Sequence, residues 1–115
     1  MQPSEINAAF AAGFNRRDVD ALLALYQPDG AVVEVDGTVS HGIDPIRDHL
    51  AGLVAIGGTM TSTNLTTVVT GDIALVTAAW EIVDASVAAS IPGRSAEVLR
   101  RNGDGTWAYL IDQPA

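Results

Sequence analysis

Two acidic residues, Glu97 and Asp112, are spaced so that they could face each other across a hairpin and act together in acid–base chemistry. Each lies in a run of alternating residue types, and Asp104-Gly105 stands between the two runs. Asp-Gly favours a tight turn, because a type I′ turn needs positive φ at both central residues, so the runs predict a β-hairpin. With that turn, Leu99 faces Leu110 and Glu97 faces Asp112. The two carboxylates would then lie opposite each other on one face of a sheet.

Facing carboxylates destabilise a sheet unless their environment compensates. In an apolar pocket one pKa rises and the pair shares a proton, which makes it a general acid–base couple. Asp112 and Glu97 are therefore the predicted catalytic residues. The alternative is that one of them lies at a strand end in solvent or pairs with Arg94 or Arg101. A three-residue loop would also turn Asp112 to the face opposite Glu97.

Glu81 and His49 are further candidates. Glu81 shares one face of the predicted strand 73–83 with Leu75, and it lines the pocket if that face points inward. Otherwise it is an acid at the frayed end of a long strand. His49 lies beside the apolar stripe of a predicted helix, as a base or hydrogen-bond donor at the pocket mouth or as a half-exposed surface residue. His41 is expected to be solvated.

The composition limits the classes of function. The chain has 115 residues, of which 48% are hydrophobic, and this suits one domain over residues 1–115 with one core. The net charge of −8 and the lack of lysine argue against binding to nucleic acid or anionic membranes. Without cysteine there are no disulfides or thiolate metal sites, and no metal or cofactor is predicted. The start of the chain lacks the features of a signal peptide, so a cytoplasmic location is expected.

The pattern of residues predicts an α+β fold, in which helices pack on one face of a curved, mainly antiparallel sheet. Helices are predicted from Ser4 to Asn15, from Asp18 to Tyr26, and from a cap at Asp44 to about Ala55. Strands are predicted at 31–35, 38–40, 63–69, 73–83, 95–101 and 106–112, with a loop or frayed hairpin at 84–93.

The order of these pieces resembles the nuclear transport factor 2-like superfamily, and within it the SnoaL-like and ketosteroid-isomerase-like small domains. The matching pieces are Arg17–Leu22, Leu25-Tyr26 followed by Asp29–Val33, His41–Arg47, Gly71–Val76 and Asp104–Trp107. The resemblance implies a cone-shaped, cystatin-like fold with three N-terminal helices packed on the curved sheet around an apolar pocket. It also implies a homodimer, since members are commonly dimers.

The resemblance carries over only part of the family's chemistry. Ketosteroid isomerases have an Asp base at the end of the first strand, where this chain has Val35, and an oxyanion Tyr where it has Phe10. Their second oxyanion acid matches Glu97, and the acid–base Asp of SnoaL-like cyclases matches Asp112. Limonene epoxide hydrolases place acids at both positions but an Arg where this chain has Ser95. The acids mark a site without naming its reaction.

We therefore expect a small-molecule-binding domain with an apolar pocket, acting on a small apolar substrate as a cyclase, isomerase or hydrolase. The alternative is a non-catalytic ligand-binding or assembly domain. The residues predicted to shape the pocket are Phe10, Phe14, Tyr26, His49, Leu53, Glu81, Leu99 and Leu110.

The predicted dimer interface lies on the opposite face of the sheet. Alternation places Trp107, Tyr109 and Ile111 on the face of the hairpin away from Glu97, with Trp80 on the matching face of the neighbouring strand. An apolar patch of this kind on a small domain marks an interface, here with a second copy of the chain. If this face were the core instead, both acids would point to solvent.

Overall fold

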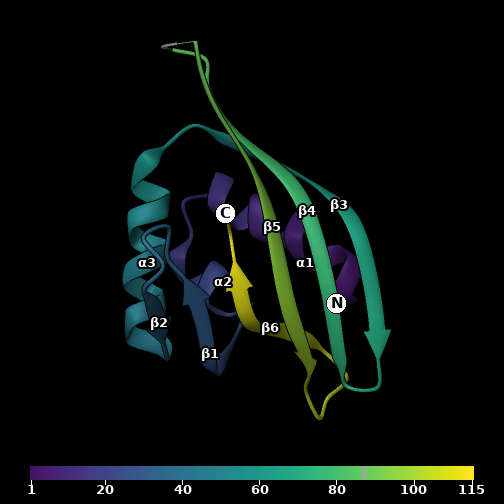
Figure 1. The fold of residues 1–115 in the computed structure, drawn as a ribbon. Coiled ribbons are helices and arrows are strands. Elements are labelled where there is room, and N and C mark those ends of the chain that lie inside the picture. Colours follow the sequence, from purple (N-terminus) through teal and green to yellow (C-terminus); the bar gives the residue numbers. More distant parts are fainter. Residues whose placement is uncertain (87) are drawn as a thin grey trace.

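The computed structural model describes residues 1–86 and 88–115 as a sheet with helices on one side of it (Figure 1). The fold class is α+β, as predicted. The elements are η1 (Pro3–Glu5), α1 (Ile6–Asn15), α2 (Val19–Leu23), β1 (Tyr26–Val33), β2 (Val39–His41), α3 (Ile43–Ile56), β3 (Thr59–Thr70), β4 (Ile73–Asp84), β5 (Ala89–Arg101) and β6 (Trp107–Gln113).

The six strands form one mixed sheet in the order β2-β1-β6-β5-β4-β3. All neighbours are antiparallel except β1 and β6, which run parallel and bring the first long strand beside the last one. The expectation of three N-terminal helices fits only loosely, because α3 follows β1 and β2. It lies beside these strands, whereas α1 lies behind β3 and β4 (Figure 1).

Several boundaries differ from the predicted ones. The second helix ends at Leu23, and β1 begins at Tyr26, which pairs with Tyr109 of β6. A register shift after Tyr26 accommodates Pro28 within β1, where its missing N–H would otherwise interrupt a regular ladder. The helix α3 begins at Ile43 after Gly42, whose φ is 84°, so the predicted cap Asp44 lies in the first turn.

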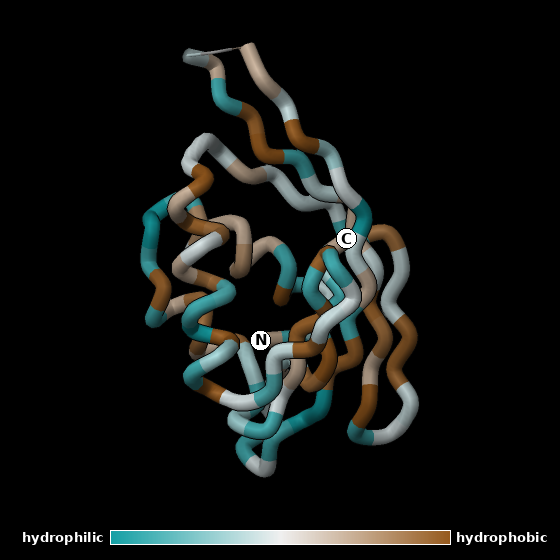
Figure 2. The backbone as a smooth tube through the Cα atoms, turned by 60° about the vertical axis from the view of Figure 1, so that its left-hand side comes forward, coloured by the Kyte–Doolittle hydropathy of each residue, from teal (hydrophilic) through white to brown (hydrophobic). Residues whose placement is uncertain are grey.

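The β4–β5 hairpin is longer than predicted and projects beyond the helices (Figures 1 and 2). Pairing continues to Asp84 and Ala89, so most of the segment predicted as a loop or frayed hairpin is strand. Val87 of that segment lies outside the described residues.

The closing hairpin reaches the predicted pairing of the acids by a different route. Asn102 N–H donates to Thr106 O at 2.7 Å, and Gly105 N–H donates to Asn102 O at 3.0 Å with Gly105 at φ 86°. These contacts define a three-residue loop with Gly at the left-handed position. Such a loop alone would turn Asp112 away from Glu97.

A bulge at Leu110 reverses that effect. Leu99 pairs with Tyr109, not with Leu110 as predicted, whereas Glu97 pairs with Asp112. The extra residue on β6 shifts the register by one and returns the two acids to the same face. Loop and bulge therefore compensate each other.

The bulge also turns the aromatic residues of β6 inward, which corrects the predicted interface. Trp107 and Tyr109 are 8% and 1% exposed and belong to the core. Trp80 also lies on the inner face, because its neighbours Ala78 and Ile82 along β4 are buried and face the helices. Glu81 then points to the opposite face, where its carboxylate accepts a hydrogen bond from Ser90 at 2.9 Å.

Two groups of buried side chains fill the space between helices and sheet. The larger joins α2, α3, β1 and the middle of the sheet and consists of Ile6, Leu22, Tyr26, Val32, Ile46, Leu50, Ala74, Val76, Leu99, Trp107 and Tyr109. The smaller joins α1 to β3 and β4 and consists of Ala11, Phe14, Met60 and Ile82. Phe10 and Val54 pack against both groups.

Gly93 leaves the space that Trp80 occupies. A Cβ at Gly93 would lie 2.1 Å from the Trp80 ring, and that ring is anchored by a hydrogen bond of 2.7 Å from Nε1 to Pro114 O. We expect Gly93→Ala to displace Trp80 and lower the free energy of unfolding by about 1–3 kcal/mol. Denaturant unfolding followed by tryptophan fluorescence measures both changes.

Gly52→Ala is the matched control. Gly52 lies on the exposed side of α3 and a Cβ there would contact nothing within 4 Å. This substitution is expected to stabilise the protein by about 0.5–1 kcal/mol, because alanine restricts the unfolded chain. Equal effects of the two substitutions would contradict the role of Gly93.

Candidate functional site

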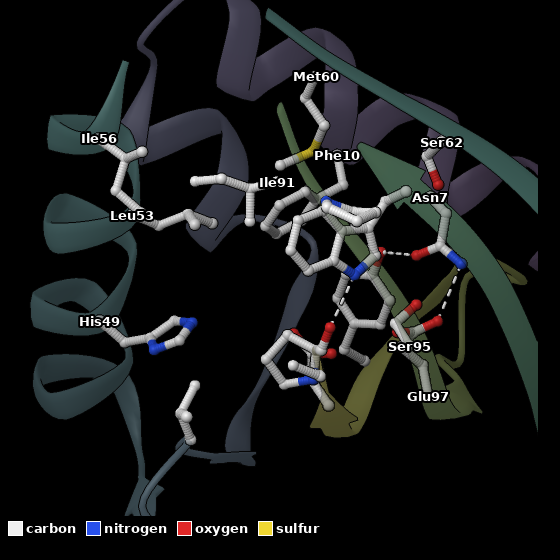
Figure 3. A pocket seen from close by; sticks show the side chains of 17 residues that line it. Asn7, Phe10, His49, Leu53, Ile56, Met60, Ser62, Ile91, Ser95 and Glu97 are labelled. Atoms are coloured by element: carbon white, nitrogen blue, oxygen red, sulfur yellow. Dashed lines mark hydrogen bonds between the residues drawn. The ribbon is translucent and has the colours of Figure 1, made fainter. Parts of the chain in front are cut away.

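A cavity of about 340 Å³ lies between α1, α3 and the inner face of the sheet (Figure 3). Most of its wall is apolar, and the polar side chains that reach it are few. The residues that line it are Asn7, Phe10, Val35, His49, Leu53, Ile56, Met60, Ser62, Trp80, Ile91, Pro92, Ser95, Glu97, Tyr109, Asp112, Pro114 and Ala115.

Glu97 and Asp112 meet on the sheet side of this cavity. They are 2% and 4% exposed and face each other across β5 and β6. Neither forms an ion pair within the described part of the chain, since Arg101 pairs with Asp72 and Arg94 is exposed on the outer face of β5. The predicted alternatives of a solvent-exposed acid or an arginine partner are therefore wrong.

Neutral hydrogen-bond donors hold the two carboxyl groups. The Tyr26 hydroxyl donates to Asp112 Oδ2 at 2.5 Å, and Asn7 Nδ2 donates to Glu97 Oε1 at 2.9 Å. The Tyr109 hydroxyl donates to Asn7 Oδ1 at 2.6 Å, which fixes the orientation of the amide. Figure 3 shows the hydrogen bond from Asn7 to Glu97. These uncharged donors orient the two acids but bring no positive charge to them.

Burial and mutual repulsion separate the protonation states of the pair. Burial, followed by the negative charge of Glu97, raises the pKa of Asp112 from 3.8 to about 8. Burial also raises the pKa of Glu97, against which its hydrogen bonds act. At neutral pH the proton of the pair therefore resides on Asp112, next to the ionised Glu97. Because Tyr26 donates to Oδ2, the proton belongs on Oδ1.

The two tyrosines remain donors at neutral pH. Burial, followed by the charge of Asp112, raises the pKa of Tyr26 and of Tyr109 well above 10.0. A protonated carboxyl beside a carboxylate, both held by fixed donors in an apolar site, can give a proton to a ligand oxygen and accept one in return.

The helix α3 contributes one further polar side chain to the cavity, that of His49. His49, Leu53 and Ile56 recur at helical spacing and extend from α3 on the side opposite Asn7 and Glu97 (Figure 3). The His49 ring contacts the Glu34 carboxylate, with Nδ1 2.9 Å from Oε2.

Five of the ten predicted site residues line the cavity: Phe10, His49, Leu53, Glu97 and Asp112. The catalytic roles of the last two stay predictions. Tyr26 does not line the cavity but supports Asp112 from behind, and Phe14 and Leu99 are 0% exposed in the core. Glu81 lies on the outer face of the sheet, and Leu110 is the bulged residue of β6.

Sequence reasoning missed Asn7, Trp80 and Glu34. Asn7 stands one position from the apolar stripe of its helix, and a polar residue there signals a buried partner. Trp80 was assigned to the wrong face of β4. Glu34 was not among the predicted site residues, because its contact with His49 depends on how α3 packs on β1 and β2.

Within residues 1–86 and 88–115, no three His, Asp or Glu side chains lie close enough together to hold a metal ion. In the same part of the chain, no helix is long and apolar enough to cross a membrane.

The family model of the SnoaL-like domain matches residues 7–110, and the chain therefore belongs to this family. The match begins at the second residue of α1 and ends at Leu110 within β6. The resemblance found in the sequence is thereby confirmed. No curated protein matches the chain.

Solved structures share the fold at low identity. A variant of Rv3472, a Mycobacterium tuberculosis protein of unknown function, is 24% identical with a TM-score of 0.81, covering 96% of this chain and 66% of that one. A ketosteroid isomerase-like protein from Erwinia carotovora atroseptica is 23% identical with a TM-score of 0.71, covering 95% and 88%. A cystatin-like domain of unknown function from Nostoc punctiforme is 13% identical with a TM-score of 0.83, covering 97% and 73%.

The raised pKa of Asp112 predicts how stability depends on pH. The folded chain keeps this proton up to about pH 8, whereas the unfolded chain releases it near pH 3.8. Between these values the folded state binds more protons, so the free energy of unfolding falls as pH rises, by at most about 1.4 kcal/mol per pH unit. Asp112→Asn keeps the shape of the neutral acid and is expected to remove this fall. Urea unfolding at several pH values measures it.

Asp48→Asn, at an exposed position of α3, is the control and should leave the pH dependence as it is in the wild type. Parallel curves for the wild type and Asp112→Asn would show that Asp112 does not hold a proton at neutral pH.

Proposed function

We propose that the protein binds a small, mostly apolar molecule in this cavity and acts on it by general acid–base chemistry. Asp112 gives a proton to a carbonyl or hydroxyl oxygen of the ligand, and the Glu97 carboxylate removes a proton from a carbon atom of the ligand or from water, so that the pair as a whole neither gains nor loses a proton. Such a step belongs to cofactor-independent cyclases, isomerases and hydrolases. The cytoplasmic location expected from the sequence is part of this proposal.

The observation that carries the proposal is a buried pair of carboxyl groups at the wall of an apolar cavity, with no ion-pair partner among the described residues. Burying two acids without a cation destabilises the fold, since the charged forms are poorly solvated there. Strongly shifted pKa values in a cavity are typical of functional sites. Membership of the SnoaL-like domain family supports the same assignment, and the family likeness alone names no substrate.

The probe for this proposal is 2-acetylnaphthalene, an apolar two-ring ketone. Its carbonyl oxygen can accept a hydrogen bond from protonated Asp112, so we expect its affinity to fall as the pH rises through about 8. Ser62→Phe should weaken binding by about tenfold or more, which is about 1.4 kcal/mol, because the ring fills the cavity. Fluorescence titration measures both effects.

Thr63→Phe is the matched control, because Thr63 is the next residue of β3 and lies on the exposed outer face. It should leave the affinity unchanged. Affinity that is independent of pH in the wild type would remove Asp112 as the proton donor. Absence of binding, or equal binding by the Ser62 and Thr63 variants, would contradict a ligand cavity.

A second candidate function is assembly through the outer face of the sheet. Val68, Leu75, Val98 and Ile111 pair in one row across β3, β4, β5 and β6. Val68, Leu75 and Ile111 are 50%, 43% and 44% exposed, and Figure 2 shows hydrophobic residues recurring along the long strands. The occupant we propose is a second copy of this chain, since the row is uncharged in a protein of net charge −8, and a two-fold axis there brings no acids together.

Sedimentation equilibrium tests this assembly. We expect a dimer, and Leu75→Asp should convert it to a monomer because the two-fold axis doubles each introduced charge. Val39→Asp, at a similarly exposed apolar position on the edge strand β2, should remain a dimer. A monomeric wild type would contradict the proposal.

A further inference from the structure

Glu34 fixes the orientation of the His49 ring. Nδ1 lies 2.9 Å from Oε2 and 3.1 Å from Oε1 of Glu34, and the Ser40 hydroxyl donates to Oε1 at 2.9 Å. The side chains of His49 and Glu34 are 14% and 28% exposed. Glu34, which directly follows β1, and Ser40 of β2 therefore hold the imidazole of α3 in place.

This contact determines which nitrogen carries the proton. An ionised carboxylate only accepts hydrogen bonds, so Nδ1 must be protonated to donate to Glu34. In the neutral ring, Nε2 then carries a lone pair and accepts. The Glu34 carboxylate is also placed to pair with the imidazolium that forms when Nε2 accepts a proton.

The ring lies in the wall of the cavity, among apolar neighbours. His49 extends from α3 toward the cavity beside Leu53, and Asn7 and Glu97 lie on the opposite side (Figure 3). The cavity thus has the acid pair, with its proton donor Asp112, on the sheet side and a further proton acceptor, His49 Nε2, on the helix side.

We propose that His49 Nε2 accepts the proton of an acidic hydroxyl group on the ligand, and that Glu34 is the residue that positions it. This inference rests on the proposed function and narrows its ligand class. The ligand is an apolar, conjugated molecule with a carbonyl oxygen at the end near Asp112 and a phenolic or enolic hydroxyl at the end near α3.

The proton balance of this step is complete within the site. The O–H bond of the ligand breaks, and an N–H bond forms at Nε2. The electron pair stays on the ligand oxygen and spreads through the conjugated frame to the carbonyl, which accepts the hydrogen bond of Asp112. The imidazolium pairs with the Glu34 carboxylate, so the step needs no oxidant or co-reactant.

Two probes that differ by one methyl group test the role of His49. These are 2-acetyl-6-hydroxynaphthalene and 2-acetyl-6-methoxynaphthalene, of which only the first has a proton to give. We expect the hydroxy compound to bind about tenfold more tightly, which is about 1.4 kcal/mol, and to show the red-shifted emission of the naphtholate. In His49→Gln, which keeps an acceptor oxygen but no basic nitrogen, the naphtholate emission should disappear.

His41→Gln is the matched control, because His41 is exposed on β2 and does not line the cavity. It should keep the naphtholate emission. Naphtholate emission that persists in His49→Gln but disappears in Glu97→Gln would assign the proton acceptor to Glu97 and overturn the inference. If neither 2-acetylnaphthalene nor its 6-hydroxy and 6-methoxy forms bind the wild type, the result contradicts the proposed function itself and not only the role of His49.

A separate measurement isolates the positioning role of Glu34. ¹⁵N NMR of the imidazole should show the Nδ1–H form in the wild type and a mixture of both tautomers in Glu34→Gln, since an amide can donate as well as accept. The variant should also lose naphtholate emission while the tryptophan fluorescence of the folded chain is kept. A wild-type ring protonated at Nε2 in its neutral form would overturn the inference.

Discussion

The burial of Glu97 beside Asp112 is the constraint on which much of this structure depends. Two acids in a low-dielectric site repel each other, and the fold tolerates them because one holds a proton and both accept hydrogen bonds from neutral donors. Those donors come from α1 and β1, so the positions of these elements are tied to the chemistry of β5 and β6. Tyr109 links the two sides, since it contacts Asn7 and packs against Tyr26 at 4.9 Å between ring centroids.

The register that creates the pair depends on two local departures from a regular hairpin. The loop ending at Gly105 has one residue more than a two-residue turn, and the bulge at Leu110 adds one unpaired residue to β6. Each departure alone would move one carboxyl group to the outer face. Bulges next to functional sites serve this purpose, because they redirect a side chain without changing the strand order.

The class of fold and half of the predicted site residues could be predicted correctly from the sequence. Whether an element or contact was predictable depends on whether local spacing determines it. The periodicity of α3 and the alternation of β4 depend on local spacing, so their existence was predictable. The facing of Glu97 and Asp112 was predicted correctly from an incorrect turn, since loop and bulge cancel. The faces of Trp107 and Tyr109 were wrong because a single unseen bulge inverts part of β6. The face of Trp80 was wrong because the alternation of β4 does not say which of its two faces shares a side with Glu97. The partners Asn7 and Glu34 depend on contacts between distant segments, which no local pattern encodes.

The parallel pairing of β1 with β6 has a consequence for how the protein folds. The hydrogen bonds to the acid pair join residues 86 and 90 positions apart, and the bond from Tyr109 to Asn7 spans 102. Closing such long loops is entropically unfavourable and slows folding, whereas the hairpins β3–β4 and β4–β5 bring together near neighbours in the chain. The donors of the acid pair therefore arrive only when the two ends of the chain meet, and a partly folded chain with intact hairpins holds Glu97 and Asp112 without Asn7 and Tyr26.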